Sequence, residues 1–216
     1  MRYKTDMIRQ KSFNYKFNND QNELNFFVNK TNYYAFNVLI NNNSQFSFLY
    51  GPNKSGKSYL AQIWLKKNNA IEYNKISNYE LILNEKKNIL IDNLINFDEE
   101  KIFHIVNSCI LNNLKILITS NNKINDIKFK YNDLSSRLKT FSNLEIKQPN
   151  DEMLLTILTK LLIDKQFVIN SNDIFKYILR RVDRSYQGIN EIVNKLDILS
   201  LEKKRQLTIP LIKEIL

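Results

Sequence analysis

The sequence predicts an α/β domain, in which helices flank a parallel sheet, followed by a small all-helical domain. Before residue 147, short apolar runs alternate with segments of helical period, which is the pattern of a parallel sheet covered by helices. After residue 150 only the helical period continues, which predicts a small bundle. A phosphate-binding motif after the first predicted strand indicates that ligands bind at the carboxyl ends of the strands.

The amino-terminal residues 1–20 show no helical or strand period and are predicted to form an extended arm. Within this arm, Gln10 is followed by two spaced aromatic residues, Phe13 and Tyr15. The spacing suits docking as an extended peptide, in which the main chain provides affinity and two pockets take the aromatic rings. Packing of the arm on its own domain is the alternative.

The first regular elements are a helix and a strand. The helix is expected to run to Ile40, with Thr31 or Asn32 as its N-cap. The apolar run Phe46–Tyr50 then predicts a buried strand, and the loop after it lies at the carboxyl end of that strand.

Residues 51–58 read G-x-x-x-x-G-K-S, the pattern of a phosphate-binding loop. In such a loop the backbone amides cradle phosphates, Lys57 neutralises their charge and Ser58 offers its hydroxyl to Mg²⁺. The chain has three glycines, and two of them occupy the fixed glycine positions of the motif. A loop kept only for packing is the alternative. The residues predicted to contact a nucleotide are Gly51, Pro52, Asn53, Lys54, Ser55, Gly56, Lys57, Ser58 and Tyr59.

The elements after the loop alternate between helix and strand. Asp92 follows a buried apolar run, and an acid at the carboxyl end of such a strand holds Mg²⁺ through water. Asn121 follows the next apolar run, where a polar side chain reaches the γ-phosphate or the attacking water; a plain turn is the alternative. Helices are expected over 58–67, 98–112 and 133–138, the last with an N-cap, a helix or turn over 78–83, and strands over 70–73, 88–93, 115–119 and 144–146.

The change of period near residue 147 divides the chain. Residues 147–150 have the proline and the polarity of a linker. The predicted organisation is therefore an arm (1–20), a nucleotide-binding α/β domain (21–147) and a helical domain (150–216), whose helices are expected over 151–163, 171–181, 185–200 and 208–216.

The composition narrows the class of protein. The formal charge of +10 over 216 residues points to an acidic partner, although part of it follows from a composition rich in Asn, Lys and Ile. The single Cys109 excludes an internal disulfide and the single His104 a multi-histidine metal site, and both are expected to pack in a helix. No apolar run of membrane length and no leader peptide is apparent, which favours a cytoplasmic protein without a membrane span.

These motifs, in this order, resemble the DnaA/Hda family of AAA+ replication proteins over essentially the whole chain, and its Hda branch most. The resemblance implies an AAA+ domain with a helical lid, ATP or ADP bound with Mg²⁺, no structural metal, and no helix-turn-helix DNA-binding domain. The segments that carry the resemblance are the amino-terminal nucleotide box (25–35, with Asn29 in place of a glycine), Walker A (51–58), Walker B (89–93), sensor 1 (117–121), the arginine-finger box (133–138) and the lid segments 182–184 and 206–216.

The resemblance also implies roles for single residues. Arg137 would be the arginine finger that completes the site of a neighbouring subunit, and Asn121 would be sensor 1. Asn93 stands where a self-sufficient ATPase has its catalytic glutamate, so weak or no intrinsic ATP hydrolysis is expected, because an amide orients water but cannot take its proton. Gln187 replaces the sensor 2 arginine, and Arg184 is the nearest substitute.

The function implied by the resemblance is regulation of chromosomal replication initiation. The chain would bind the DNA polymerase sliding clamp through Gln10, Phe13 and Tyr15, contact the ATP-loaded initiator DnaA, and stimulate its ATP hydrolysis through Arg137. A weak contact with DNA and formation of a homodimer are further possibilities. One alternative is an adaptor or loader, recruited by DNA or DnaA, that does not stimulate hydrolysis. The other is a small-molecule phosphotransferase. It is disfavoured because such enzymes hold two phosphorylated substrates with a cluster of arginines, and the helical domain here lacks that cluster.

Overall fold

The computed structural model describes residues 26–42, 44–74, 79–169 and 171–216. By its internal contacts the chain divides into two compact units, one with the described residues up to Leu154 and the other with Leu155–Leu216. The aromatic motif around Gln10 lies outside the described residues. Within the described part of the chain, no helix is long and apolar enough to cross a membrane.

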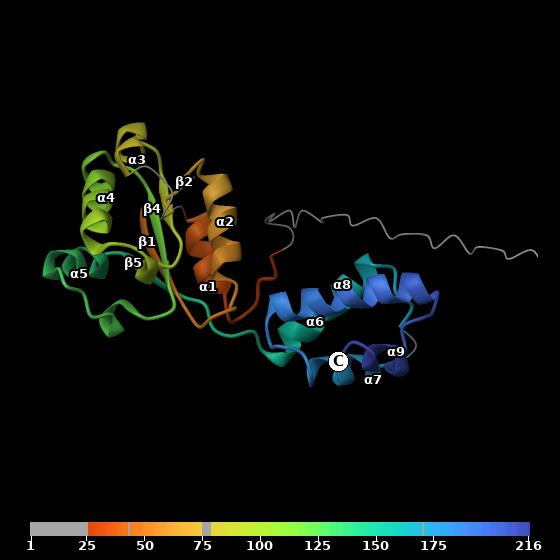
Figure 1. Cartoon of the computed structure of the whole chain (residues 1–216). Coiled ribbons are helices and arrows are strands. Elements are labelled where there is room, and N and C mark those ends of the chain that lie inside the picture. The colour runs from red at the N-terminus through yellow and green to blue at the C-terminus, as the bar shows by residue number, and fades with distance from the viewer. Residues whose placement is uncertain (1–25, 43, 75–78, 170) are drawn as a thin grey trace, which may run out of the picture. The chain divides into compact units, whose positions relative to one another are not determined.

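The first unit is built on a parallel sheet (Figure 1). All four neighbouring pairs of its strands run parallel, which confirms the predicted α/β class. Their carboxyl ends therefore meet at one edge, where the phosphate-binding motif and the strand ends with polar residues come together. Among the described residues the strands are β1 (Phe46–Tyr50), β2 (Ile71–Glu72), β3 (Ile89–Ile91), β4 (Ile116–Ser120) and β5 (Ser142–Glu145), in the order β2-β3-β4-β1-β5.

Helices cover both faces of this sheet, and each face has its own apolar cluster (Figure 1). On one face, α2 and the π-helical turn that continues α1 bury Leu39, Leu60 and Trp64 against the sheet. On the other face, α4 and α5 bury residues such as Ile105 and Leu134. The helices of this unit are α1 (Tyr33–Phe36, continued by a π-helical turn, Asn37–Asn41), α2 (Lys57–Lys67), α3 (Tyr79–Glu85), α4 (Glu99–Leu111) and α5 (Asn132–Lys139).

The starts of α1 and α5 differ in detail from expectation. Asn32 directly precedes α1 as predicted, but its side chain makes no cap hydrogen bond and instead accepts from the Asn29 backbone N–H at 2.8 Å. For α5 the N-cap is Tyr131, again with no side-chain cap. The chain there is held by a carboxylate from α4, because Glu99 accepts from the backbone N–H groups of Lys130 and Tyr131 at 2.7 and 3.2 Å.

The two residues that could have suggested metal or thiol chemistry lie on opposite sides of α4. Cys109 is fully buried in the apolar cluster, and burial raises the pKa of its thiol to about 12, so the thiol stays protonated and packs as predicted. The expectation that His104 also packs in the core is wrong, because its side chain is exposed. The helical period places position 104 on the solvent side, away from Ile102 and Ile105.

The second unit is a helical bundle, as predicted. Side chains cap α8 and α9: Ser185 accepts from the Gly188 N–H at 3.0 Å and Thr208 from the Leu211 N–H at 3.4 Å. The helices that end in or lie within this unit are α6 (Asp151–Asp164), α7 (Asp173–Leu179), α8 (Tyr186–Lys203) and α9 (Ile209–Lys213), and their buried side chains include Leu158, Leu162, Ile178, Leu196 and Leu211.

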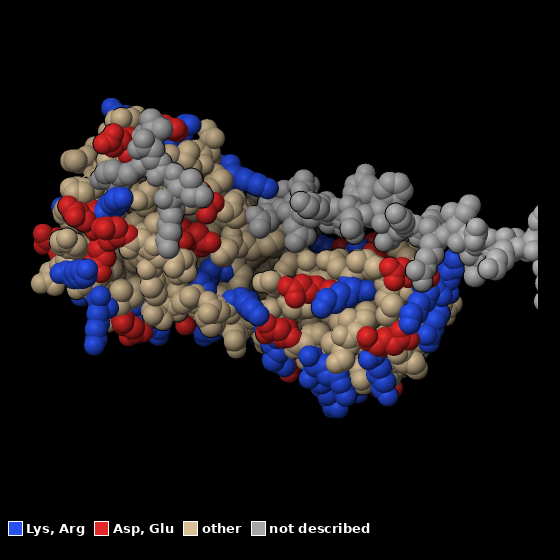
Figure 2. Space-filling model, viewed as in Figure 1, with Lys and Arg blue, Asp and Glu red and all other residues tan. Residues whose placement is uncertain are grey.

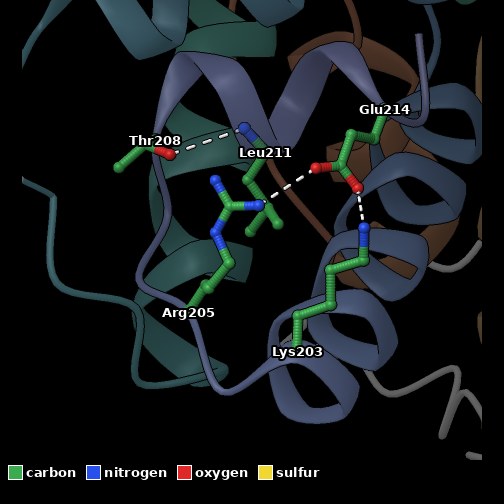
Figure 3. Close-up of polar contacts among 5 residues, drawn as sticks. All are labelled: Lys203, Arg205, Thr208, Leu211 and Glu214. Carbon is green, nitrogen blue, oxygen red and sulfur yellow. Dashed lines mark hydrogen bonds and ion pairs between the residues drawn. The ribbon is translucent and has the colours of Figure 1, made fainter.

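An ion-pair cluster connects the end of α8 to the last turn of the chain (Figure 3). Glu214 accepts from Lys203 and, at 3.1 Å, from Arg205. The hydrogen bond from Lys203 holds the pKa of Glu214 below its ordinary 4.5. The ionised carboxylate therefore stabilises the fold above pH 4.5, and this contribution is lost as the pH falls through the lowered pKa.

We expect Glu214→Gln to unfold at a lower urea concentration than the wild type at pH 7, because glutamine cannot pair with Lys203 and Arg205. The gap in urea midpoint should close when the pH is taken well below 4.5. Circular dichroism at both pH values measures this gap, with Glu202→Gln, an exposed acid of α8 next to Lys203, as the control. A gap of equal size in acid would contradict the assignment.

Candidate functional site

The phosphate-binding loop depends on glycine at its two motif positions. A Cβ atom on Gly51 would lie 2.1 Å from the carbonyl oxygen of Ile146, so the loop runs directly against the chain that follows β5. Gly56 has a φ of 100°, a left-handed conformation that side chains rarely adopt, and it forms the N-cap of α2. The turn therefore brings the first amides of α2 to the carboxyl edge of the sheet, where they can receive an anion.

We expect Gly51→Ala to lower the free energy of unfolding by about 3 kcal/mol, because the added methyl group meets backbone that cannot move as a side chain would. Asn53→Ala, in an exposed position of the same loop, should change it by less than about 0.5 kcal/mol. Urea unfolding of both variants measures the difference. Equal stability of the two variants would show that the close approach to Ile146 is not present in solution.

Lys57 supplies the cation of the loop. Only 8% of its surface is exposed, and its ammonium group donates to the carbonyl oxygens of Gly51 and Pro52, at 2.8 Å each. Burial lowers the pKa of Lys57 below its ordinary 10.5, and the charge of Asp92 opposes that shift. The loop thus holds a desolvated positive charge close to the acid that ends β3, an arrangement suited to phosphate and its metal ion.

The acid at the end of β3 is held by Thr119, which lies in the predicted sensor 1 segment 117–121 but was given no role of its own from the sequence. The hydroxyl of Thr119, in β4, donates to Asp92 Oδ1 at 2.5 Å and accepts from the Asn93 N–H at 2.8 Å. Asn93 has a left-handed backbone, with φ at 65°, and among the described residues its buried Oδ1 atom has no hydrogen-bond donor. The signal that could have found Thr119 is a hydroxyl at the end of a buried strand next to the Asp92 strand.

Ser58 and Asn121, also predicted to take part in binding nucleotide and Mg²⁺, lie at the start of α2 and directly after β4. Ser58 is exposed at the start of α2, so its hydroxyl is accessible to a hydrated metal ion. Asn121 is partly buried directly after β4, and its role as sensor 1 stays a prediction. Among the described residues, no group of three or more His, Cys, Asp or Glu side chains forms a protein-only metal site. The donors fit a metal that arrives with the phosphates, since one carboxylate and one hydroxyl leave most ligand positions to water and phosphate oxygens.

One aromatic side chain of the nucleotide box, Phe26, lies beside the loop. The ring of Phe26 stacks on Phe36 with centroids 5.7 Å apart and lies 5.6 Å from the Tyr59 ring. Its Cε2 atom would be 3.8 Å from a Cβ on Gly56. The box therefore packs directly on the turn that begins α2.

Asn29, which stands in place of a glycine of the family pattern, organises the turn of the nucleotide box. Its Oδ1 atom accepts from the N–H and the hydroxyl of Thr31, at 2.8 and 2.6 Å. Its amide donates to Asn150 Oδ1 at 3.3 Å, and the same oxygen accepts from the Met153 N–H. The substitution therefore connects the nucleotide box to the start of α6 by side-chain hydrogen bonds.

Arg137 lies on the opposite face of the sheet from α2. Leu134 and Leu138 anchor α5 in the cluster of that face, and the guanidinium of Arg137 lies 5.3 Å from the ring centroid of Phe103, on α4. The side chain is partly exposed and stacked rather than buried. In this position it is not part of the chain's own phosphate-binding loop.

The lid candidates lie together at the start of α8. Arg184 is exposed just before the N-cap Ser185, and Gln187, in the first turn, donates to Glu191 on the same helix at 2.8 Å. On the face that Figure 2 shows, basic and acidic side chains of the described residues are interspersed over both units. That distribution gives no support on this face to a broad nucleic-acid surface from the net charge alone.

Comparison with known families and proteins found similarities for the helical unit and for the chain as a whole. Residues 151–216 match the family described as "Hda, lid domain". The chain is 25% identical, over 213 residues, to the chromosomal replication initiator protein DnaA of Buchnera aphidicola subsp. Cinara cedri (strain Cc). That alignment covers 85% of this chain and 48% of the Buchnera protein, so the chain spans about half the length of this relative.

Solved structures show the same fold. The structure of domain III of the Thermotoga maritima replication initiation protein DnaA matches with a TM-score of 0.77 and 17% identity, covering 92% of this chain and 96% of that one. The AMPPCP-bound DnaA of Aquifex aeolicus matches with a TM-score of 0.67 and 18% identity, covering 82% of this chain and 65% of that one.

Proposed function

Because the chain is an AAA+ protein of the DnaA/Hda family, we propose that it regulates replication initiation by stimulating ATP hydrolysis in the initiator DnaA. The observation that carries the proposal is the separation of two cations suited to phosphate. Lys57 lies in the chain's own loop, whereas Arg137 lies on the opposite face of the sheet. One cation serves a nucleotide held by this chain, and the other is left for a nucleotide held by a partner.

The chain's own nucleotide is ATP or ADP with Mg²⁺. Its phosphates are received by the first amides of α2 and by Lys57, while Ser58 and Asp92 hold the hydrated metal ion. Mg²⁺ neutralises phosphate charge in such a site. The related DnaA of Aquifex aeolicus was solved with the ATP analogue AMPPCP, which supports an adenine nucleotide in this fold.

This nucleotide is hydrolysed slowly or not at all. Asn93 follows the Walker B acid, and an amide has no basic group that takes a proton from water. The bound nucleotide then stabilises the AAA+ domain and presents the chain to its partner without being consumed. Intrinsic turnover of ATP by the purified chain is expected to be weak.

Arg137 acts in trans. A guanidinium stabilises the charge that develops on a transferring phosphoryl group, and its planar fork pairs with two phosphate oxygens. Arg137 stacks on Phe103 and is partly exposed, so a side-chain rotation that loses one cation–π contact would free this fork for a neighbouring subunit.

Recruitment to DNA is proposed to run through the sliding clamp. Gln10, Phe13 and Tyr15 lie in the place of the family's clamp-binding peptide and match it in part, since Lys11 stands where that peptide usually has leucine and Asn14 also departs from its pattern. A weak direct contact with DNA and a homodimer are secondary proposals, motivated by the charge of +10 and by the AAA+ fold.

The test is the rate of ATP hydrolysis by DnaA from the same cell, measured alone, with this protein, and with this protein plus clamp loaded on DNA. We expect stimulation that needs both this protein and the clamp. Stimulation without any need for the clamp would contradict the recruitment route. No stimulation under any condition, with nucleotide still bound, would replace the proposal by the adaptor or loader alternative.

A further inference from the structure

We propose that Thr119 is a positioning residue that orients the Asp92 carboxylate toward the Mg²⁺ of the bound nucleotide. The proposal rests on nucleotide and Mg²⁺ binding as set out above, and it gives a role to Thr119, a residue of the predicted sensor 1 segment 117–121 in which only Asn121 had been assigned one. Its basis is a hydroxyl that joins the Walker B acid to the turn that follows it.

The hydroxyl of Thr119 both donates and accepts a hydrogen bond. Its single O–H donor goes to Asp92 Oδ1 at 2.5 Å, and its oxygen accepts from the Asn93 N–H at 2.8 Å. A hydrogen bond to a carboxylate is charge-assisted and directional. Only a residue that both donates and accepts makes this pair of contacts, which leaves serine as the closest substitute.

The sheet makes this hydroxyl a fixed point. Thr119 is 1% exposed and lies in β4, between β3 and β1. Its register partner in β1 is Leu49, two residues before the phosphate-binding loop, and the register between β3 and β4 ends at Ile91 and Ile118, one residue before Asp92 and Thr119. Strand pairing on both sides therefore sets the position of the hydroxyl, and through it one oxygen of Asp92.

Fixing one oxygen has a consequence for metal binding. A carboxylate held through Oδ1 cannot rotate freely, so its second oxygen is offered in one direction and no rotational freedom is lost when a hydrated metal ion arrives. The charge of Asp92 already acts on Lys57. An unheld carboxylate could turn toward that ammonium group and pair with it, in competition with the metal ion.

The experiment measures binding of a fluorescent ADP analogue with Mg²⁺ and with EDTA, for the wild type, Thr119→Val and Thr119→Ser. Valine keeps the shape but has no hydroxyl, and serine keeps the hydroxyl. We expect Thr119→Val to reduce the ratio of the affinity with Mg²⁺ to the affinity with EDTA about tenfold, with the affinity in EDTA unchanged. Thr119→Ser should keep this ratio within about twofold of the wild-type value. Thr159→Val, which removes a hydroxyl hydrogen bond from α6, is the matched control.

An unchanged Mg²⁺ ratio in Thr119→Val would overturn the proposal, as would an equal loss in the serine variant. A wild type that binds no nucleotide under either condition would overturn the proposed function itself, which separates the two failures. If Thr119→Val does not fold, Thr119→Cys takes its place, because a thiol of similar size is only a weak donor. The same reduced ratio is expected of it, and an unchanged ratio counts against the proposal.

Discussion

Replacing Arg137 with alanine is expected to lower the stimulation of DnaA ATP hydrolysis by about 10³-fold or more, which is the scale of an arginine finger supplied in trans. The side chain has no role in the chain's own phosphate-binding loop, since it stacks on Phe103 on the other face of the sheet. Nucleotide affinity of this chain should therefore stay within about twofold. The measurement is DnaA hydrolysis with clamp and DNA present.

Two further variants separate the arginine finger from a general charge effect. Arg137→Lys keeps the charge but has no planar fork, so it should recover little of the stimulation. Lys139→Ala removes a positive charge from the exposed end of the same helix and should leave the stimulation unchanged. Equal losses in Arg137→Ala and Lys139→Ala would assign the effect to surface charge. Full stimulation by Arg137→Ala would exclude the finger and favour an adaptor.

Replacing Lys57 with alanine is expected to weaken nucleotide binding by about 100-fold or more, since about 3 kcal/mol is typical for leaving a buried charge without its partner. The reason lies in the burial of the ammonium group, which has already lost most of its water before the phosphate arrives. Calorimetric titration with ADP and Mg²⁺ measures it. Lys67→Ala, in the last turn of the same helix, makes the same change of charge and should bind as the wild type does.

The same residue makes a prediction about pH. Because burial holds the pKa of Lys57 below 10.5, the unfolded chain binds more protons at this group than the folded chain does between the lowered pKa and 10.5. The stability of the nucleotide-free protein contributed by this group therefore rises with pH through that window. In Lys57→Met the rise should be absent, which urea unfolding at a series of alkaline pH values detects. An identical pH dependence in both proteins would contradict the buried position of the ammonium group.

Local sequence patterns predicted most of the fold because each depends on neighbouring residues. The apolar run Phe46–Tyr50 became β1 over the same residues, and the helix expected over 98–112 became α4 with Asp98 as its N-cap. Alternation of such segments is enough to predict a parallel sheet with its ligand edge at the carboxyl ends of the strands. The turn of Gly51–Ser58 was equally local, since its glycines and Lys57 are close in the chain.

Hydrogen bonds between residues far apart in the sequence could not be predicted from local patterns. The capping of the chain before α5 by Glu99 spans 31 residues, and the bond from Asn29 to Asn150 spans 121. No local pattern marks these pairs, because asparagine and glutamate are also common on a solvated surface where they have no such partner. Exposure of His104 was likewise misjudged, although the helical period that buries Ile102 and Ile105 already points position 104 outward.

The sequence by itself determined the chemistry that this protein can offer: a phosphate-binding loop with Lys57, an acid at Asp92, an amide at Asn93, and an arginine at position 137. Only the tertiary structure decided which groups act together. It brought Thr119 onto Asp92 across 27 residues and placed Arg137 on the face away from α2. The physical reason is that residue types and short spacings set local conformation and reactivity, whereas the pairing and packing of strands and helices set which side chains meet.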